Sequence, residues 1–276
     1  MKSRGFVIFA DGEAHVEQAY LAALSLKATD NAYPVTLVTN NTVSNKIETV
    51  FDKIAKIPWY KQDNTRLKTE NRWKIYHATP YEETIVLDSD VLILQNLDYA
   101  WNLLKNYDIY YPTRVFTYRS ESVESDYYRK AFTANNLPNF YNCFHYFKKS
   151  SMAKQFFEWV ELISNNWELF YGSFCAEHYP SQPSMDVTTA IASKIMDCDC
   201  EISNSFSDIV KVVHMKSQIQ NWKTPTSRWQ DRVGVYLNQE LSLKIGNFRQ
   251  NTVFHYTEND FVTRDMIEKY EKCLQM

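Results

Sequence analysis

Two aspartates separated by one serine lie inside a strongly apolar stretch of the chain. Residues 84–94 read Thr-Ile-Val-Leu-Asp-Ser-Asp-Val-Leu-Ile-Leu, a pattern typical of a strand buried on both faces. A buried carboxylate without a partner is very costly, so Asp88 and Asp90 must be hydrogen-bonded, paired or bound to a cation. If the strand bends at Ser89, both carboxylates can share one hard divalent ion, Mn²⁺ or Mg²⁺, that also takes phosphate oxygens. A solvated turn is the alternative, but the tight apolar frame favours the metal site.

The elements before these aspartates predict a parallel sheet. Strand patterns at 5–10 and 34–39 flank a helical pattern at 13–27, and this β-α-β order favours parallel strands with right-handed crossovers. Ligands of such sheets bind beyond the carboxyl ends of the strands. Asp11 and Asp88 each follow a predicted strand, so we expect both at that edge.

The rest of the chain continues the alternation of strands and helices. Residues 114–138 are polar and aperiodic, and a connection of this length is often a functional lid or a mobile loop. Residues 164–184 also read as irregular. The pattern predicts helices at 45–51, 65–80, 98–105, 150–163, 185–195 and from about 263, and strands at 53–57, 107–112, 139–147 and 209–215.

Composition limits the classes of function. The chain has 276 residues, of which 45% are hydrophobic, enough for one large domain. The net charge of −3 gives no global field that would favour nucleic acid. Basic residues are frequent in 211–249, and this segment either receives an anion or carries scattered surface cations.

Cysteine usage and hydropathy predict a cytoplasmic protein. The five cysteines are an odd number, and Cys198-Asp-Cys200 lacks the second pair of a zinc site, so free thiols in a reducing compartment are expected. The apolar run near the amino terminus is too short for a signal peptide. No stretch approaches the roughly 20 apolar residues of a transmembrane helix.

Several features recur in the order of one known family. An acidic loop follows the first strand, an Asp-x-Asp follows an apolar strand, and an aspartate opens a later helix. Further along, a strand ends in His214, with Lys216 and Trp222 behind it. Over about residues 5–225 this arrangement resembles the GT-A glycosyltransferases, most closely the glycogenin-like, lipopolysaccharide-galactosyltransferase-like group.

The resemblance implies both a fold and an activity. The fold is an α/β, Rossmann-like domain at 1–225 with a mostly parallel central sheet flanked by helices, and an irregular, aromatic-rich extension at 226–276 packs on it. The activity is transfer of a sugar, with retention of configuration, from a nucleotide-sugar that we expect to be UDP-linked. Mn²⁺ or Mg²⁺ would be held by Asp88, Asp90 and His214.

The same resemblance assigns further site residues. Asp186 and Asn142 would lie at the donor sugar as catalytic residues, although Asp186 also suits a helix N-terminus. Lys74 would contact donor phosphate or sugar, with a solvated helix lysine as the alternative. The remaining donor-binding residues are Ala10, Asp11, Gly12, Ser89 and Lys216.

The chain also departs from the family pattern. It reads Asn-Cys-Phe at 142–144 where the family has Asn-Ser-Gly, Val187 replaces a glutamine, and the glycine after the late histidine is missing. These departures favour a rival interpretation as a non-catalytic module that binds carbohydrate or nucleic acid. A nucleotidyltransferase is a second rival, but it normally carries a Gly-rich phosphate loop near the amino terminus that this chain lacks.

The acceptor is not apparent from the pattern. A glycan and a modified DNA base are both compatible with an aromatic tail that contains Trp222, Trp229, Tyr236 and Tyr256, because such rings stack on sugars and on bases. The oligomeric state is not indicated.

Overall fold

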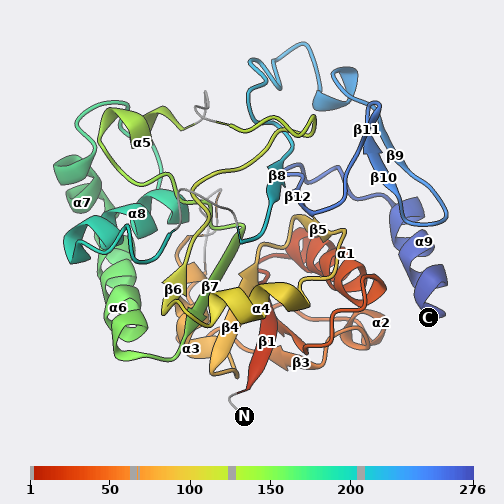
Figure 1. Ribbon diagram of the computed structural model, residues 1–276, viewed down its shortest axis with the longest axis horizontal. Helices are drawn as coiled ribbons and strands as arrows, with labels where there is room; N and C mark the ends of the chain where they lie inside the picture. Colours follow the sequence, from red (N-terminus) through yellow and green to blue (C-terminus); the bar gives the residue numbers. More distant parts are fainter. Residues whose placement is uncertain (1–2, 63–66, 68, 124–128, 204–208) are drawn as a thin grey trace.

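A six-stranded sheet forms the centre of the computed structural model, which describes residues 3–62, 67, 69–123, 129–203 and 209–276 (Figure 1). The strand order is β3-β2-β1-β4-β7-β6. The four strands β3, β2, β1 and β4 pair in parallel, and β7 pairs antiparallel with both β4 and β6, so β7 is the one reversed strand of this sheet. The expected mostly parallel sheet is therefore confirmed. The bounds are β1 Arg4–Phe9, β2 Val35–Val38, β3 Lys53–Ala55, β4 Glu83–Leu87, β6 Ile109–Tyr110 and β7 Phe144–Lys148.

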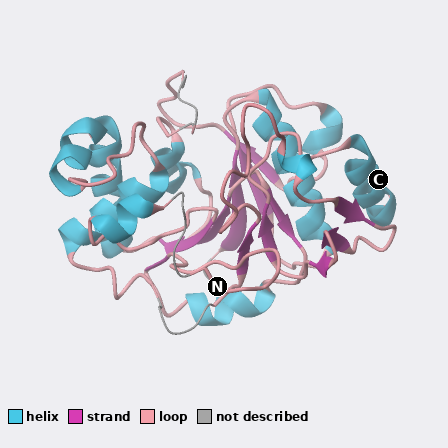
Figure 2. Cartoon of the chain, turned by 90° about the horizontal axis from the view of Figure 1, so that it is seen from above, coloured by secondary structure: helices cyan, strands magenta, loops and turns pink. Residues whose placement is uncertain are grey.

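Helices cover both faces of this sheet, which explains why its strands are continuously apolar (Figure 2). Side chains alternate along a strand, so Phe6 and Ile8 of β1 join the core beneath α1, whereas Val7 and Phe9 join the core beneath α6 and α8. The helix bounds are α1 Glu13–Ala28, α2 Asn45–Glu48, α3 Ile75–Ala78, α4 Asp98–Leu104, α6 Ser151–Asn165 and α8 Met185–Met196.

The apolar stretch at 84–94 is divided between two sheets. β4 ends at Leu87 in the large sheet, and β5 (Val91–Ile93) belongs to a small sheet of order β5-β12-β8. β12 (Val253–His255) is the middle strand of that small sheet and pairs in parallel with β8 (Val212–His214). The chain thus bends at Asp88–Asp90, as the metal-site hypothesis required.

The C-terminal residues are integrated into the fold. β9 (Val235–Leu237), β10 (Leu243–Ile245) and β11 (Phe248–Arg249) form an antiparallel sheet beside α9 (Arg264–Leu274), at the right of Figure 1. α9 is fixed to α1 by the Tyr20 hydroxyl, which donates to Glu271 Oε1 at 2.8 Å. The proposed division of the chain at residue 225 stays a prediction.

Three expected elements differ from those observed. The helix predicted at 65–80 is a 3₁₀ turn, η1 (Arg72–Lys74), followed by α3, and part of the prediction lies outside the described residues. The strand predicted from 139 begins only at Phe144. The loop at 114–138 contains α5 (Lys130–Ala134), and its residues 124–128 lie outside the described residues.

The interpretation of 164–184 as irregular is wrong, because α7 (Trp167–Phe174) forms there. Gly172 weakens the local helical signal. Tertiary contacts compensate: Tyr171 is buried, and its hydroxyl donates to the Ser184 carbonyl oxygen at 2.8 Å. Packing against the following segment therefore stabilises a helix that the local pattern does not predict.

All five cysteines are free thiols, as expected. Within the described residues, every helix is too short or too polar to cross a membrane.

Candidate metal centre and donor site

The turn Asp88-Ser89-Asp90 connects the two sheets and fixes both aspartates through its backbone. The amide of Asp88 donates to the Cys143 carbonyl oxygen at 3.0 Å, and the Asp90 carbonyl oxygen accepts from the Tyr256 amide at 3.1 Å. The Ser89 hydroxyl is buried and donates to Gln18 Oε1 of α1 at 3.4 Å. Ser89 therefore contacts α1, and this contact helps to position the aspartates on either side of it.

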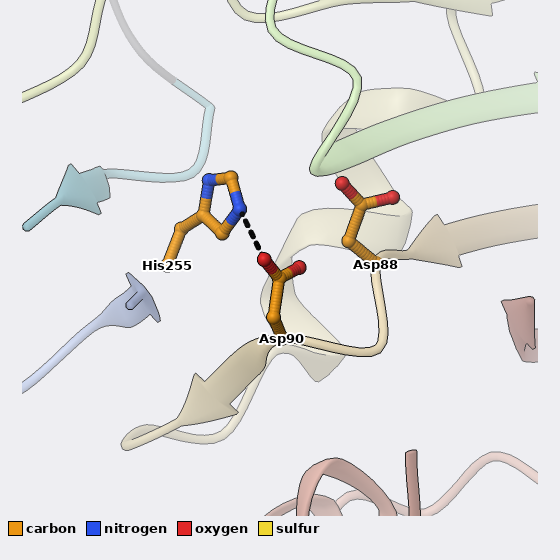
Figure 3. A group of neighbouring side chains, drawn as sticks. All are labelled: Asp88, Asp90 and His255. Carbon is orange, nitrogen blue, oxygen red and sulfur yellow. Dashed lines mark hydrogen bonds and ion pairs between the residues drawn. The ribbon is translucent and has the colours of Figure 1, made fainter. Parts of the chain in front are cut away.

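Asp88, Asp90 and His255 form a three-residue cluster at this turn (Figure 3). One potential ligand atom from each residue lies within 4.8 Å of the other two, and all three side chains are half-buried. His255 Nε2 is 3.1 Å from Asp90 Oδ2. Ligands on opposite sides of a six-coordinate Mg²⁺ ion lie about 4.2 Å apart, so small side-chain rotations suffice for one ion to bind all three.

His214, the histidine predicted as a ligand, lies beside this cluster. It pairs with His255 in the parallel register of β8 and β12, and the two ring centroids are 5.1 Å apart. His214 Nδ1 lies 2.6 Å from the Ser217 hydroxyl. Among the described residues, the cluster with metal-ligand geometry contains His255 and not His214. Lys216 is half-buried in the turn after β8, close enough for its charge to contribute to the lowered pKa of His214, after burial and His255.

An arginine supplies positive charge at the same place. Arg72 Nη2 donates to Asp88 Oδ1. Burial raises the pKa of Asp88 above its ordinary value, with Asp90 adding to the rise and Arg72 opposing it. Burial alone would raise the pKa of Asp90 too, but His255 and Arg72 lower it to about 2. Burial alone would lower the pKa of His255, but Asp90 and Cys143 raise it well above its ordinary value. A metal ion bound by this ring would have to displace a proton from it.

A second polar group is centred on Asp186, which lies in the first turn of α8. Asp186 Oδ1 accepts from the Asn142 amide at 2.9 Å and from Asn142 Nδ2 at 3.1 Å. The structure thus brings together the two residues predicted as catalytic. Burial alone would raise the pKa of Asp186, but Arg129 and Asn142 outweigh it and lower the pKa. Asp186 is therefore held as a carboxylate.

Arg129 is the main partner of Asp186. Its Nη1 donates to Asp186 Oδ2 at 2.5 Å, and Nε donates to Asn139 Oδ1 at 2.5 Å. The guanidinium lies between the rings of Phe132 and Tyr141, 4.1 and 3.9 Å from their centroids. These contacts fix the guanidinium in one orientation and, with it, the carboxylate of Asp186.

A small cavity of about 10 Å³ separates the two polar groups. Arg72 and Asn142 line it together with Tyr111 and His145, whose rings stack at 5.0 Å. The Tyr111 hydroxyl has no hydrogen-bond partner among the described residues. The rest of the wall is apolar and includes Phe9, Val86 and Phe157. Arg72 therefore contacts Asp88 of the metal cluster and also lines the cavity next to Asn142 of the Asp186 group.

The loop after β1 reaches the expected edge of the sheet. Asp11 Oδ1 accepts from the Tyr60 hydroxyl at 3.1 Å, and Oδ2 accepts from Asn71 Nδ2 at 2.9 Å. Gly12 has a φ of 122°, a conformation that a residue with a side chain rarely adopts. Ala10 is buried, and its amide donates to the Val38 carbonyl oxygen at 3.0 Å.

Lys74 is buried rather than solvated, so the alternative of a solvated helix lysine is wrong. Its Nζ donates to the Trp59 carbonyl oxygen at 2.8 Å and to Asn71 Oδ1 at 2.7 Å. Burial lowers the pKa of Lys74. Because Asn71 also donates to Asp11, Lys74 supports the loop at residues 10–12 through Asn71, whereas Arg72 of the same turn contacts Asp88.

Comparison with known proteins identifies the family. The family described as putative mannosyltransferase matches residues 3–197. The chain belongs to this family. The match covers the central sheet, the Asp-x-Asp turn and Asp186, and it ends before His214 and His255. No curated protein matches the chain in sequence.

This putative mannosyltransferase family member shares its fold with solved glycosyltransferases. Mouse xyloside xylosyltransferase 1 is 12% identical and superposes with a TM-score of 0.52, over 94% of this chain and 99% of that protein. Galactosyltransferase LgtC, solved with donor and acceptor sugar analogues, is 15% identical with a TM-score of 0.49, over 98% and 95%. GlyE of Streptococcus pneumoniae TIGR4 is 13% identical with a TM-score of 0.45, over 74% and 46%, so the chain spans less than half of GlyE. The fold is GT-A, as the sequence predicted.

Three functional candidates of this family member were missed at the level of sequence. Arg72 lies two residues before Lys74, the residue to which the resemblance assigns the donor contact. Arg129 lies in a stretch that reads as a polar loop. His255 follows an apolar pair at the end of a short strand pattern, Val-Phe-His, which was a usable but weak signal.

Proposed function

We propose that the chain is a divalent-metal-dependent glycosyltransferase that moves a hexose from a nucleoside diphosphate sugar to a hydroxyl of a glycan. Mannose is the sugar that the family description names, and UDP is the carrier expected from the sequence. The proposal is carried by one observation: Asp88, Asp90 and His255 converge at the carboxyl edge of the central sheet, where α/β sheets bind their ligands.

The residues of the cluster suit Mn²⁺ or Mg²⁺. Two carboxylates and one neutral imidazole leave room for phosphate and water oxygens around a hard ion. Bound there, the ion would neutralise charge on the departing nucleoside diphosphate. Arg72 adds a fixed positive charge next to Asp88, directed at the same region. Fixed charges at the point where negative charge develops are the main source of rate enhancement in such sites.

Asp186 and Asn142 would act on the sugar. Asn142 and Arg129 occupy part of the hydrogen-bonding capacity of Asp186, and lone pairs remain on its Oδ2. A sugar hydroxyl that donates to this carboxylate would be oriented without any change of protonation, because Asp186 is held ionised. The retention of configuration implied by the resemblance and the cytoplasmic location stay predictions.

The nucleotide would lie along the loop at residues 10–12. Asp11 is fixed by Tyr60 and Asn71, so the loop backbone has a defined conformation before any ligand binds. The amide of Gly12 donates to Asn41 Oδ1 at 2.8 Å, which fixes the loop from its other side. A preorganised loop binds a ribose or a base at a lower entropic cost than a mobile one.

The decisive experiment measures release of nucleoside diphosphate from a panel of UDP- and GDP-linked hexoses. Glycans and hydroxymethylated DNA serve as acceptors, so that both acceptor classes left open by the sequence are compared. We expect turnover with Mn²⁺ or Mg²⁺ that stops with a chelator and returns when the ion is restored. The Asp88→Asn variant should lose on the order of 100-fold in kcat/KM or more.

A matched variant separates loss of the site from loss of the fold. Asp108→Asn removes a half-exposed acid that pairs with Lys148 at 3.2 Å, and Lys148 lies opposite Glu83, at the end of β4 away from Asp88. It should retain near-normal turnover. Turnover that ignores chelator and survives Asp88→Asn would refute a metal-dependent transferase. Donor binding without turnover would instead support the rival non-catalytic module.

A further inference from the structure

Most of the aromatic residues of the tail from Trp222 onward are core residues. Trp222, Trp229 and Tyr256 are buried, and rings of this group stack on one another, with Tyr256 and Phe261 at 4.4 Å. The idea that these three rings stack on a ligand is therefore wrong. Tyr236 of β9 differs from them, because 62% of its surface is exposed.

Tyr236 borders a groove between η2 (Trp229–Asp231), β9 and α9. The groove has a volume of about 570 Å³, within the range of pockets that bind small ligands. None of its lining residues belongs to the metal cluster or to the Asp186 group. The residues that the argument uses are Trp229, Gln230, Tyr236, Asp260, Asp265 and Lys269.

The polar wall of the groove is centred on Asp260. Its Oδ1 accepts from Trp229 Nε1 at 2.6 Å, and its Oδ2 accepts from Gln230 Nε2 at 2.6 Å. Both donors are neutral, so the negative charge of Asp260 is oriented by hydrogen bonds without an ion pair among the described residues. Each carboxylate oxygen retains a lone pair for another donor.

A second acceptor in the wall lacks a partner. Gln230 Oε1 is buried and has no hydrogen-bond partner among the described residues. A buried polar atom in this state costs stability until a donor reaches it. By contrast, Lys269 is engaged by Asp265 Oδ2 at 2.6 Å and by the Leu237 carbonyl oxygen at 2.7 Å. The groove therefore presents the remaining lone pairs of Asp260 together with an exposed aromatic face, whereas Gln230 Oε1 is buried within its wall.

These features select the ligand by its chemistry. An anionic ligand would face the charge of Asp260, and a purely apolar one would remove this carboxylate from water without supplying a hydrogen-bond donor. A pyranose ring carries several hydroxyl donors around an apolar C–H face, and the groove offers acceptors and an aromatic ring for them. We propose that this groove is a second saccharide-binding site, which holds a neutral oligosaccharide outside the reaction centre.

The test titrates the full-length chain with mannotriose, maltotriose and cellotriose by calorimetry, with trilysine as a cationic probe. We expect at least one trisaccharide to bind. Tyr236→Ala should weaken that binding about tenfold or more, the size of a lost ring contact. Because Tyr236 is exposed, its replacement leaves the core intact. Tyr99→Ala, at a tyrosine of α4 that is 44% exposed, is the matched control and should bind normally.

Asp88→Asn keeps this inference separate from the proposed enzymatic activity. It should abolish turnover and leave binding in the groove unchanged, so either idea can fail alone. Trisaccharides that do not bind, binding that survives Tyr236→Ala, or capture of trilysine in place of the saccharides would each overturn the groove as a saccharide site.

Discussion

His255 and His214 are direct neighbours across the parallel pairing of β12 and β8, with ring centroids 5.1 Å apart. His255 contacts Asp90, whereas His214 contacts Ser217. Two adjacent imidazoles thus have different partners, and only the geometry distinguishes the candidate ligand from its neighbour.

The first prediction concerns these two histidines. His255→Ala removes one of three candidate ligands and should weaken Mn²⁺ binding by about 100-fold or more. His214→Ala should weaken it by less than the roughly 10- to 100-fold that follows loss of a residue hydrogen-bonded to a ligand, because His214 bonds Ser217 instead. Mn²⁺ binding is measured by electron paramagnetic resonance on variants whose circular dichroism matches that of the parent. The reverse ranking would make His214 the ligand, as the resemblance alone implies.

A second prediction separates the ion from the arginine. Arg72→Met removes a positive charge beside Asp88, so Mn²⁺ should bind at least as tightly as before because two cations no longer compete for that carboxylate. Turnover should nevertheless fall by about 100-fold, since the leaving diphosphate loses a fixed cation. Ion affinity and kcat/KM are measured on the same preparation. Arg119→Met, which breaks a half-exposed ion pair with Glu121, is the control and should change neither.

If Arg72→Met abolished Mn²⁺ binding instead, the arginine would be a structural support of the turn rather than a partner of the diphosphate.

A third prediction follows from the pair Arg129 and Asp186. Arg129 lowers the pKa of Asp186, so the carboxylate persists to a lower pH than an ordinary buried acid. The lowered pKa of Asp186 stabilises the folded protein at pH values above the pKa that Asp186 has in the unfolded chain. This stabilisation is lost as the pH falls through the pKa of Asp186 in the folded protein. Arg129→Met keeps an apolar stem between Phe132 and Tyr141 but removes the charge. The acidic limb of the kcat/KM profile should therefore move to higher pH.

The control for this shift is Arg129→Lys, which restores a charge without the planar fork and should move the acidic limb less. An unchanged limb in Arg129→Met would show that Asp186 does not govern the acidic side of the profile.

A fourth prediction tests how the C-terminal helix is held. The Tyr20 hydroxyl donates to Glu271, which also pairs with Lys46. Burial alone would raise the pKa of Glu271, but Lys46 and Tyr20 outweigh it and lower the pKa. Tyr20→Phe should reduce the free energy of unfolding by about 1 to 3 kcal/mol, the range for a buried hydrogen bond to a charged group. Urea denaturation measures the change.

Tyr99→Phe removes a hydroxyl that accepts from Gln95 at an exposed position, and it should change the unfolding free energy by less than about 0.5 kcal/mol. Equal effects of the two variants would contradict a specific role of Tyr20 in holding α9.

Local pattern alone determined the parallel core and the place of the two aspartates. The apolar runs around β1 and β4 require burial on both faces, and that requirement is met wherever helices cover the sheet. Asp88 and Asp90 lie between two apolar runs, so burial would remove both carboxylates from water. Each carboxylate therefore needs a partner, and the chain has to bend there for the two side chains to share one. The helix expected at 185–195 is also present as α8, with Asp186 in its first turn.

Only the tertiary structure decided which side chains complete these groups. His255 lies 165 residues after Asp90 and reaches it because β12 inserts between β5 and β8, a pairing that depends on strand register rather than on composition. The partners of Arg72 and Arg129 could not be predicted for the same reason. An arginine in an irregular segment has no periodic pattern that indicates the direction of its guanidinium. The local pattern of apolar residues is enough to predict which residues are buried. The partner of each buried polar side chain depends instead on contacts between segments that are distant in sequence.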